Sequence, residues 1–155
     1  MILFAYGSNT NPGVMAERCP GAETIGAARL MDYRLCFPRY SRVHNGALVG
    51  IEPSPGHAVW GVLFSIPAAE IDVLNYHEGF DARAPLARNV RVLREITVHR
   101  VGSYEPMAAF AYFTVPDGSA ERPSPEYLQQ IIDGATYHGL PKAWIAALER
   151  LVQHE

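Results

Sequence analysis

Residues 2–13, ILFAYGSNTNPG, join an apolar run to a small polar turn and a helix start. The run predicts a buried strand over residues 1–6, and Asn11 followed by Pro12 is typical of a helix N-terminus. Gly7 between them permits close approach of the backbone. A strand that runs into a helix start gathers unpaired backbone N–H groups, which suit an anion such as a carboxylate. An ordinary turn has the same pattern, so both interpretations stay open here.

The rest of the chain predicts strands first and helices last. Asn45-Gly46 is a hairpin signal between two of the strands. Strand-like apolar patterns cover residues 24–37 (one or two strands), 47–51, 59–66, 90–98 and 107–115. Helical patterns follow Asn11, run from Pro67 to about His77, follow Ser124, and cover residues 144–152. This segregation favours an α+β fold, and antiparallel strands with few spare edges favour a small closed or nearly closed barrel.

The composition is that of an ordinary globular protein. At 155 residues, with a net charge of −3, the chain is expected to form a single domain over residues 1–155. The densest basic stretch, residues 83–100, predicts a strand with a solvated face rather than a nucleic-acid surface. No segment resembles a signal peptide or a membrane span, so we expect a cytoplasmic protein. Cys19 and Cys36 lack a paired motif and are expected to stay reduced.

Two further stretches could carry chemistry. In LNYHEGF, residues 74–80, Glu78 falls in the last turn of a helix that Gly79 ends. The negative end of the helix dipole makes a carboxylate a better proton acceptor, although a solvated glutamate at a helix end has the same pattern. Tyr127 follows the N-cap Ser124 and could point into the core or into a cleft.

Other catalytic motifs are missing. No pair of histidines has the i, i+4 spacing or the HExxH context of a zinc site, so no metal ligands are predicted. Ser8 has no GxSxG elbow around it, and Cys36 lies in a predicted strand with no base near it in sequence. The residues therefore do not indicate a covalent nucleophile.

Four stretches together resemble one family. FAYGSN (residues 4–9), VWGVLFSI (59–66), LNYHEGF (74–80) and PSPEYLQQIIDGA…HGLP (123–141) occur in the order seen in γ-glutamylcyclotransferases and their AIG2-like relatives. The resemblance spans residues 2 to about 148. It implies a small mixed β-barrel with flanking helices, and a reaction without a cofactor that converts a γ-glutamyl amide to 5-oxoproline and a free amine. We expect a small-molecule γ-glutamyl substrate, no nucleic-acid or membrane partner, and a monomer or homodimer.

The resemblance also implies roles for single residues. Glu78 matches the proton acceptor, and Tyr127 matches a tyrosine that contacts substrate in relatives. The substrate's own α-amine is the nucleophile, so the protein needs to orient the substrate, accept a proton and stabilise an oxyanion. The loop that holds the γ-glutamyl group maps onto Leu3, Phe4, Ala5, Tyr6, Gly7, Ser8 and Asn9.

One stretch departs from the family pattern. Many relatives have a tyrosine before an R-x-x-V-x-V strand, where this chain has Pro85-Leu86. That loop is expected to border the leaving amine, so γ-glutamyl dipeptides, γ-glutamylamines, glutathione and γ-glutamyl-protected metabolites all stay open as substrates. Two other functions also stay open: a non-catalytic module that binds γ-glutamyl or carboxylate groups, and an amidohydrolase that acts on γ-glutamyl amides and releases glutamate.

Overall fold

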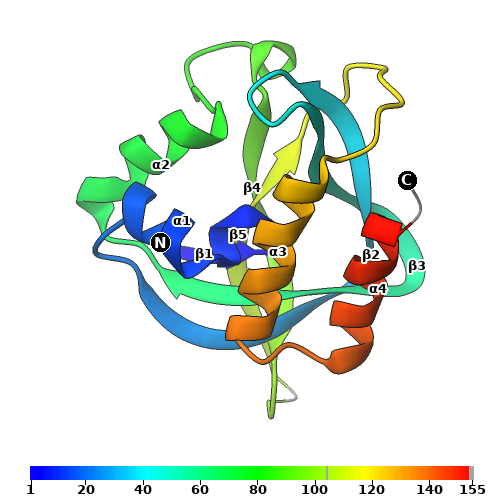
Figure 1. Ribbon diagram of the computed structural model, residues 1–155. Helices are drawn as coiled ribbons and strands as arrows, with labels where there is room; N and C mark the ends of the chain where they lie inside the picture. The colour runs from blue at the N-terminus through cyan, green and yellow to red at the C-terminus, as the bar shows by residue number, and fades with distance from the viewer. Residues whose placement is uncertain (104, 154–155) are drawn as a thin grey trace.

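Five strands close into a barrel in the computed structural model, which describes residues 1–103 and 105–153 (Figure 1). Around the barrel the order is β1-β3-β2-β4-β5; β1 pairs with β5 in parallel, and the other pairs are antiparallel. The predicted α+β fold with a small mixed barrel is confirmed. The strands are β1 (Ile2–Ala5), β2 (Glu23–Ser41), β3 (Gly46–Ser65), β4 (Arg91–Arg100) and β5 (Pro106–Thr114).

Three helix termini lie where the sequence places their caps, whereas α2 begins at Ile71, after a 3-10 turn, and not at Pro67. The Asn11 side chain accepts from the N–H groups at the start of α1, the Ser124 side chain accepts from that of Tyr127 in α3, and Gly79 ends α2 with φ 70°. In Figure 1, α3 lies in front of the barrel between α1 on its left and α4 on its right, and α2 lies at the upper left. The helices are α1 (Pro12–Arg18), α2 (Ile71–Glu78), α3 (Pro125–Tyr137) and α4 (Lys142–Gln153), with 3-10 turns η1 (Ser8–Thr10), η2 (Ala68–Glu70) and η3 (Leu86–Arg88).

The prediction of separate strands at residues 47–51 and 59–66 is wrong, because both belong to the continuous strand β3. Residues 24–37 likewise lie in the single long strand β2. The two strands pair as a hairpin around residues 42–45, with register shifts between Met31 and Tyr33 and further along. Such bulges bend a strand without ending it, so the backbone stays extended through the polar and proline residues that separate the apolar stretches in sequence.

One hydrophobic core joins the barrel to the helices. Leu3 and Phe4 of β1 are almost fully buried, and each such side chain contributes about 1.5–3 kcal/mol of transfer free energy. Leu74 of α2, Ile131 of α3 and Leu148 of α4 belong to the same cluster. The turn that follows β1 is therefore held between the barrel and α3. No helix among the described residues has the length and apolar character needed to cross a membrane.

Gly134 lets α3 approach the turn after β1. A Cβ at this position would lie 2.6 Å from the carbonyl carbon of Thr10 and 2.7 Å from the nitrogen of Asn11. In an exposed helix a glycine-to-alanine change stabilises by about 1 kcal/mol. Here we expect Gly134→Ala to lower the free energy of unfolding by about 1–3 kcal/mol in urea denaturation, because backbone atoms must move. Gly13→Ala in α1, with no contact closer than 3.4 Å, is the control; equal stabilisation of both variants would contradict this role.

Candidate active site

The turn after β1 contains backbone N–H groups that are available to bind a ligand. The N–H of Thr10 donates to the Gly7 carbonyl at 3.1 Å, and the N–H of Asn11 donates to the Ser8 carbonyl at 3.0 Å. The N–H groups of Ser8 and Asn9 come before these two donors in the chain. No carbonyl group of the turn accepts a hydrogen bond from them, as is usual for the first N–H groups of a helical turn. The Thr10 hydroxyl also donates to the Gly7 carbonyl, at 2.8 Å, and fixes the turn. This geometry suits an anion or a developing oxyanion.

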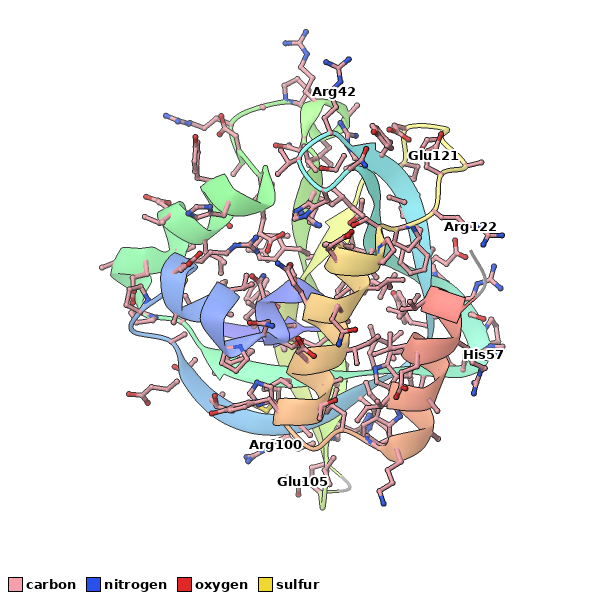
Figure 2. All side chains as sticks on the ribbon, viewed as in Figure 1. Arg42, His57, Arg100, Glu105, Glu121 and Arg122 are labelled. Atoms are coloured by element: carbon pink, nitrogen blue, oxygen red, sulfur yellow. The ribbon has the colours of Figure 1, made fainter. Side chains whose placement is uncertain are left out.

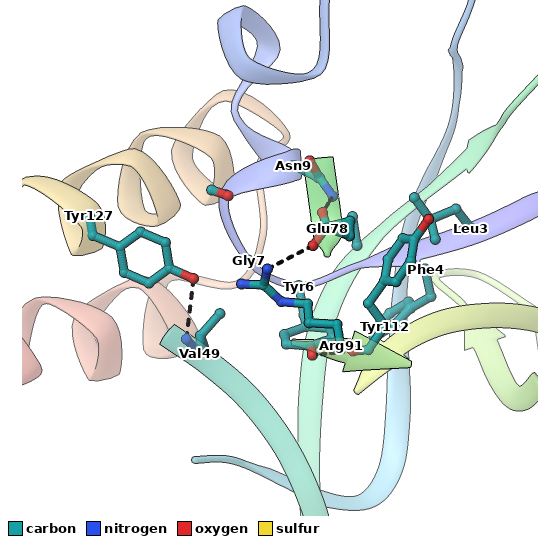
Figure 3. Close-up of a pocket in the computed structure, with 12 residues that line it drawn as sticks. Leu3, Phe4, Tyr6, Gly7, Asn9, Val49, Glu78, Arg91, Tyr112 and Tyr127 are labelled. Atoms are coloured by element: carbon teal, nitrogen blue, oxygen red, sulfur yellow. Dashed lines mark hydrogen bonds and ion pairs between the residues drawn. The ribbon is translucent and has the colours of Figure 1, made fainter. Parts of the chain in front are cut away.

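Glu78, the last residue of α2, is buried beside this turn. Only 4% of it is exposed, so it is not a solvated glutamate at a helix end. The Asn9 side-chain amide donates to Oε1 of Glu78, and Nη1 of Arg18 lies 3.4 Å from the same oxygen. Nη1 of Arg91 lies 3.0 Å from Oε2 (Figure 3). The carboxylate is therefore held from three sides by the turn, by α1 and by β4.

The two arginines offset the cost of burying this carboxylate. The Glu78 side chain is buried at the C-terminal end of α2, and the guanidinium groups of Arg18 and Arg91 contact its two oxygens. Burial, the largest single effect, lowers the pKa of the Arg91 guanidinium, but the Glu78 carboxylate together with Tyr127 and Tyr6 raises this pKa above its usual value. One carboxylate between two guanidinium groups leaves one net positive charge, so the cluster attracts an anionic ligand.

All nine residues that the sequence singles out line one pocket, which has a cavity volume of about 30 Å³. The closed part of the pocket is therefore narrow. Segments from β1, β3, α2, β4, β5 and α3 meet here, although they are far apart in the chain. The lining residues are Leu3, Phe4, Ala5, Tyr6, Gly7, Ser8, Asn9, Val49, Glu78, Arg91, Tyr112 and Tyr127.

Two tyrosines of the pocket wall form hydrogen bonds to the backbone through their hydroxyl groups. The Tyr127 hydroxyl accepts from the backbone N–H of Val49 at 3.2 Å, so this side chain is both packed and part of the pocket wall (Figure 3). The Tyr6 hydroxyl donates to the Tyr112 carbonyl. Burial raises the pKa of both Tyr6 and Tyr127 well above the usual range, so both stay neutral near pH 7. They shape the cavity without adding charge.

Sequence reasoning missed Val49, Arg91 and Tyr112. It placed the basic stretch at residues 83–100 on a solvated face, and for Arg91 this is wrong, because only 12% of its side chain is exposed. The alternation of apolar residues in β4 gives a face, but it cannot show that the end of α2 covers that face at Arg91.

The other residues that the sequence raised as possible site residues lie outside this pocket. Pro85 and Leu86 do not line this pocket; Leu86 lies in a separate groove with Arg94 and Phe113. The thiol of Cys36 is unbridged, and burial raises its pKa to about 11, which leaves little thiolate at neutral pH. In the part of the chain that the structure describes, no three His, Cys, Asp or Glu side chains gather as metal ligands would.

Two half-buried histidines pack against the elements of the site. The His44 ring lies 4.7 Å from the Tyr127 ring, centroid to centroid, and Nε2 of His138 lies 3.0 Å from the Thr10 carbonyl oxygen. Burial lowers the pKa of both; for His44 the nearby Arg91 adds to the effect, and for His138 the hydrogen bond to Thr10 opposes it. Both side chains therefore bind a proton more readily in the unfolded chain.

These shifts predict a loss of stability in mild acid. Because the unfolded state takes up more protons below a pH of about 6.5, the free energy of unfolding should fall as the pH drops from about 7 to 5. Urea denaturation across that range measures the slope. The double variant His44→Gln/His138→Gln should show a flatter profile. An unchanged slope in that variant would mean that other groups cause the pH dependence.

Comparison with known proteins identifies relatives over most of the chain. The sequence model of the AIG2-like family matches residues 58–148. A mouse protein (Mus musculus) named gamma-glutamylcyclotransferase is 32% identical over 158 residues, which covers 99% of this chain and 80% of the relative. The human protein (Homo sapiens) of the same name is 29% identical over 148 residues, covering 90% and 72%.

The fold agrees with the sequence comparison. A solved structure titled gamma-glutamyl cyclotransferase superposes with a TM-score of 0.84 at 28% identity, and the match covers 96% of this chain and 85% of that one. Barrel, flanking helices and chain order are thus shared with these relatives. The chain belongs to the AIG2-like family and has gamma-glutamylcyclotransferases as its relatives.

Proposed function

We propose that the protein is a γ-glutamyl cyclotransferase, which converts a γ-glutamyl amide to 5-oxoproline and releases the amine. One observation carries the proposal: a buried carboxylate, Glu78, is hydrogen-bonded to Asn9 of an amide-presenting turn inside a single pocket. Such a pocket contains a proton acceptor and oxyanion donors together. Relatives named gamma-glutamylcyclotransferase, aligned over most of the chain, support the same reaction.

The reaction needs no nucleophile from the protein. The substrate's α-ammonium gives one proton to Glu78, and the resulting amine attacks the γ-carbonyl carbon to form the C–N bond of the ring. The N–H groups of Ser8 and Asn9 stabilise the oxyanion that develops. Glu78 gives this proton to the leaving nitrogen as the bond from the γ-carbon to that nitrogen breaks. The ring nitrogen still carries a second proton, which passes by way of Glu78 to the released amine, so the products are 5-oxoproline and an ammonium. Atoms and protons balance without water.

The positive charge of the pocket suits the α-carboxylate of the substrate. A γ-glutamyl group has an α-carboxylate on the same carbon as the attacking amine. The excess positive charge of Arg18 and Arg91 attracts this carboxylate. Because Arg91 also contacts Glu78, a carboxylate bound beside Arg91 brings the α-amine within reach of Glu78. Holding amine and γ-carbonyl together can account for several kcal/mol of the barrier, out of about 7–11 kcal/mol for well-oriented reactions.

Product identification tests the proposal. Wild-type protein and Glu78→Gln are incubated with a γ-glutamyl dipeptide, a γ-glutamylamine and glutathione, and the products are separated by liquid chromatography and mass spectrometry. We expect 5-oxoproline and the free amine in equal amounts from at least one substrate. Glutamate as the product would instead identify an amidohydrolase. Thermal stabilisation by these compounds with no product above the Glu78→Gln background would identify a binding module.

A further inference from the structure

Tyr112, in β5, forms a hydrogen bond to each half of the candidate site. Its backbone carbonyl accepts from the hydroxyl of Tyr6, the residue that leads directly into the turn with the free N–H groups. Its own hydroxyl donates to Oδ1 of Asn75 at 2.5 Å. Asn75 belongs to α2 and comes three residues before Glu78. One residue of the barrel therefore connects the turn to the helix that ends at Glu78.

The hydroxyl of Tyr112 lies inside the protein. Polar side chains at the surface, such as those of Arg42, Glu105 and Arg122, point away from the body of the molecule (Figure 2). Tyr112 is only 4% exposed. Burial raises the pKa of its hydroxyl well above the usual range, so the group keeps its proton near pH 7 and donates it to Asn75. Because a buried hydroxyl without a partner is costly, this hydrogen bond restrains both side chains.

Asn75 in turn fixes the last turn of α2. Its backbone carbonyl accepts from the N–H of Phe80 at 2.9 Å, a bond that closes the helix beyond Glu78. Residues three apart lie on the same face of a helix, so Asn75 and Glu78 are neighbours on the face that meets the barrel. A helix of eight residues is too short to be stable alone, so contacts with the barrel set its position. The bond to Tyr112 is such a contact, and it lies one helical turn from the carboxylate.

We infer that Tyr112 is a positioning residue, which sets the place of Glu78 relative to the turn through its hydrogen bond to Asn75. The inference rests on the proposed function, in which Glu78 accepts a proton from the same substrate whose oxyanion the turn stabilises. Both groups must then reach one bound molecule at hydrogen-bond distance. A displacement of about 1 Å between such groups can lower a rate by about 10²-fold. Tyr112 contributes by holding the two halves of the site at a fixed separation.

The kinetics of Tyr112→Phe, which removes only the hydroxyl, test this role. We expect kcat for 5-oxoproline formation to fall by about ten- to a hundredfold. KM should stay within about threefold, because Arg91 is unchanged. Asn75→Leu cuts the same bond from the other side, so the double variant should be at most about twofold slower than the slower single variant. Tyr76→Phe is the matched control: it removes a hydroxyl from the same helix at a side chain that is 81% exposed, and its kcat should stay within about twofold of wild type. A wild-type kcat in Tyr112→Phe, or additive losses in the double variant, would overturn the inference.

Amide hydrogen exchange, followed by NMR, tests the position of α2 without turnover. In Tyr112→Phe the amides of Gly79 and Phe80, which close α2, should exchange at least about tenfold faster than in wild type. The amide of Leu148 in α4 should change by less than about twofold. Unchanged exchange at Gly79 and Phe80, or an equal rise at all three amides, would overturn the positioning role. If wild-type protein forms no 5-oxoproline, the proposed function fails, whereas the exchange rates still decide whether Tyr112 holds the end of α2.

Discussion

Glu78→Gln is expected to slow the release of 5-oxoproline by about 10²- to 10⁴-fold, the range that a positioned general base contributes. The amide keeps the size of the carboxylate and can still hydrogen-bond to Asn9, but it cannot take a proton from the substrate ammonium. The initial rate of 5-oxoproline formation, measured by mass spectrometry at saturating substrate, gives the effect. It should fall mainly in kcat, because proton transfer occurs in the reacting complex.

Glu17→Gln is the matched control, since it removes an acidic charge from an exposed position of α1, next to Arg18. Its rate should stay within about twofold of wild type, the scale of surface changes. Glu78→Gln leaves Arg18 and Arg91 without their counter-charge, so its folded fraction must be checked by circular dichroism before rates are compared. A folded Glu78→Gln variant with wild-type kcat would remove Glu78 from the mechanism.

Arg91→Met is expected to lower the free energy of unfolding by about 3–5 kcal/mol, the cost of breaking a buried ion pair from one side. The carboxylate of Glu78 would stay buried with the hydrogen bond from Asn9 and a single remaining ion pair, the longer contact to Arg18 at 3.4 Å. In the proposed reaction the same change also removes charge that attracts the α-carboxylate, so KM should rise. Urea denaturation gives the stability, and initial rates over a range of substrate concentrations give KM.

Two variants separate charge from packing. Arg91→Lys keeps a cation and should recover part of the stability and of the KM. Arg94→Met removes an arginine from an exposed position of the same strand, where its guanidinium stacks on Phe113 at 5.4 Å. Its loss of stability should stay within about 1 kcal/mol, the range of exposed cation–π contacts. If Arg91→Met were as mild as Arg94→Met, the ion pair with Glu78 would not stabilise the site.

Local signals in the sequence predict the helix boundaries well. Asn11 and Ser124 cap the helices they precede, and Gly79 adopts the left-handed conformation that ends α2. Each depends on hydrogen bonds and dihedral angles within a few residues, which a sequence window contains. The gathering of Glu78 with the residue 2–9 segment into one pocket was expected only from resemblance, because no local pattern links segments so far apart.

The features that sequence could not give depend on long-range packing. Continuity of β3 follows from pairing with β2, which keeps the chain extended where its own residues favour a break. The burial of Arg91 follows from the position of α2, and its charge is stabilised by Glu78, thirteen residues earlier in the chain. A solvated arginine and a buried, paired arginine give the same pattern in a strand sequence. The alternation of apolar and polar residues assigns each residue to one of the two faces of the strand, but it does not show which face another element of the fold covers.

Incubation in H₂¹⁸O tests the central claim most directly, since it asks whether the substrate's own amine or water attacks the γ-carbonyl. The protein is incubated in labelled water with a γ-glutamyl amide that it converts, and the masses of the products are measured by mass spectrometry. Attack by the α-amine predicts 5-oxoproline with no ¹⁸O and an equal amount of free amine. Glutamate with one ¹⁸O in its γ-carboxylate would show that water attacks, and would contradict the cyclisation.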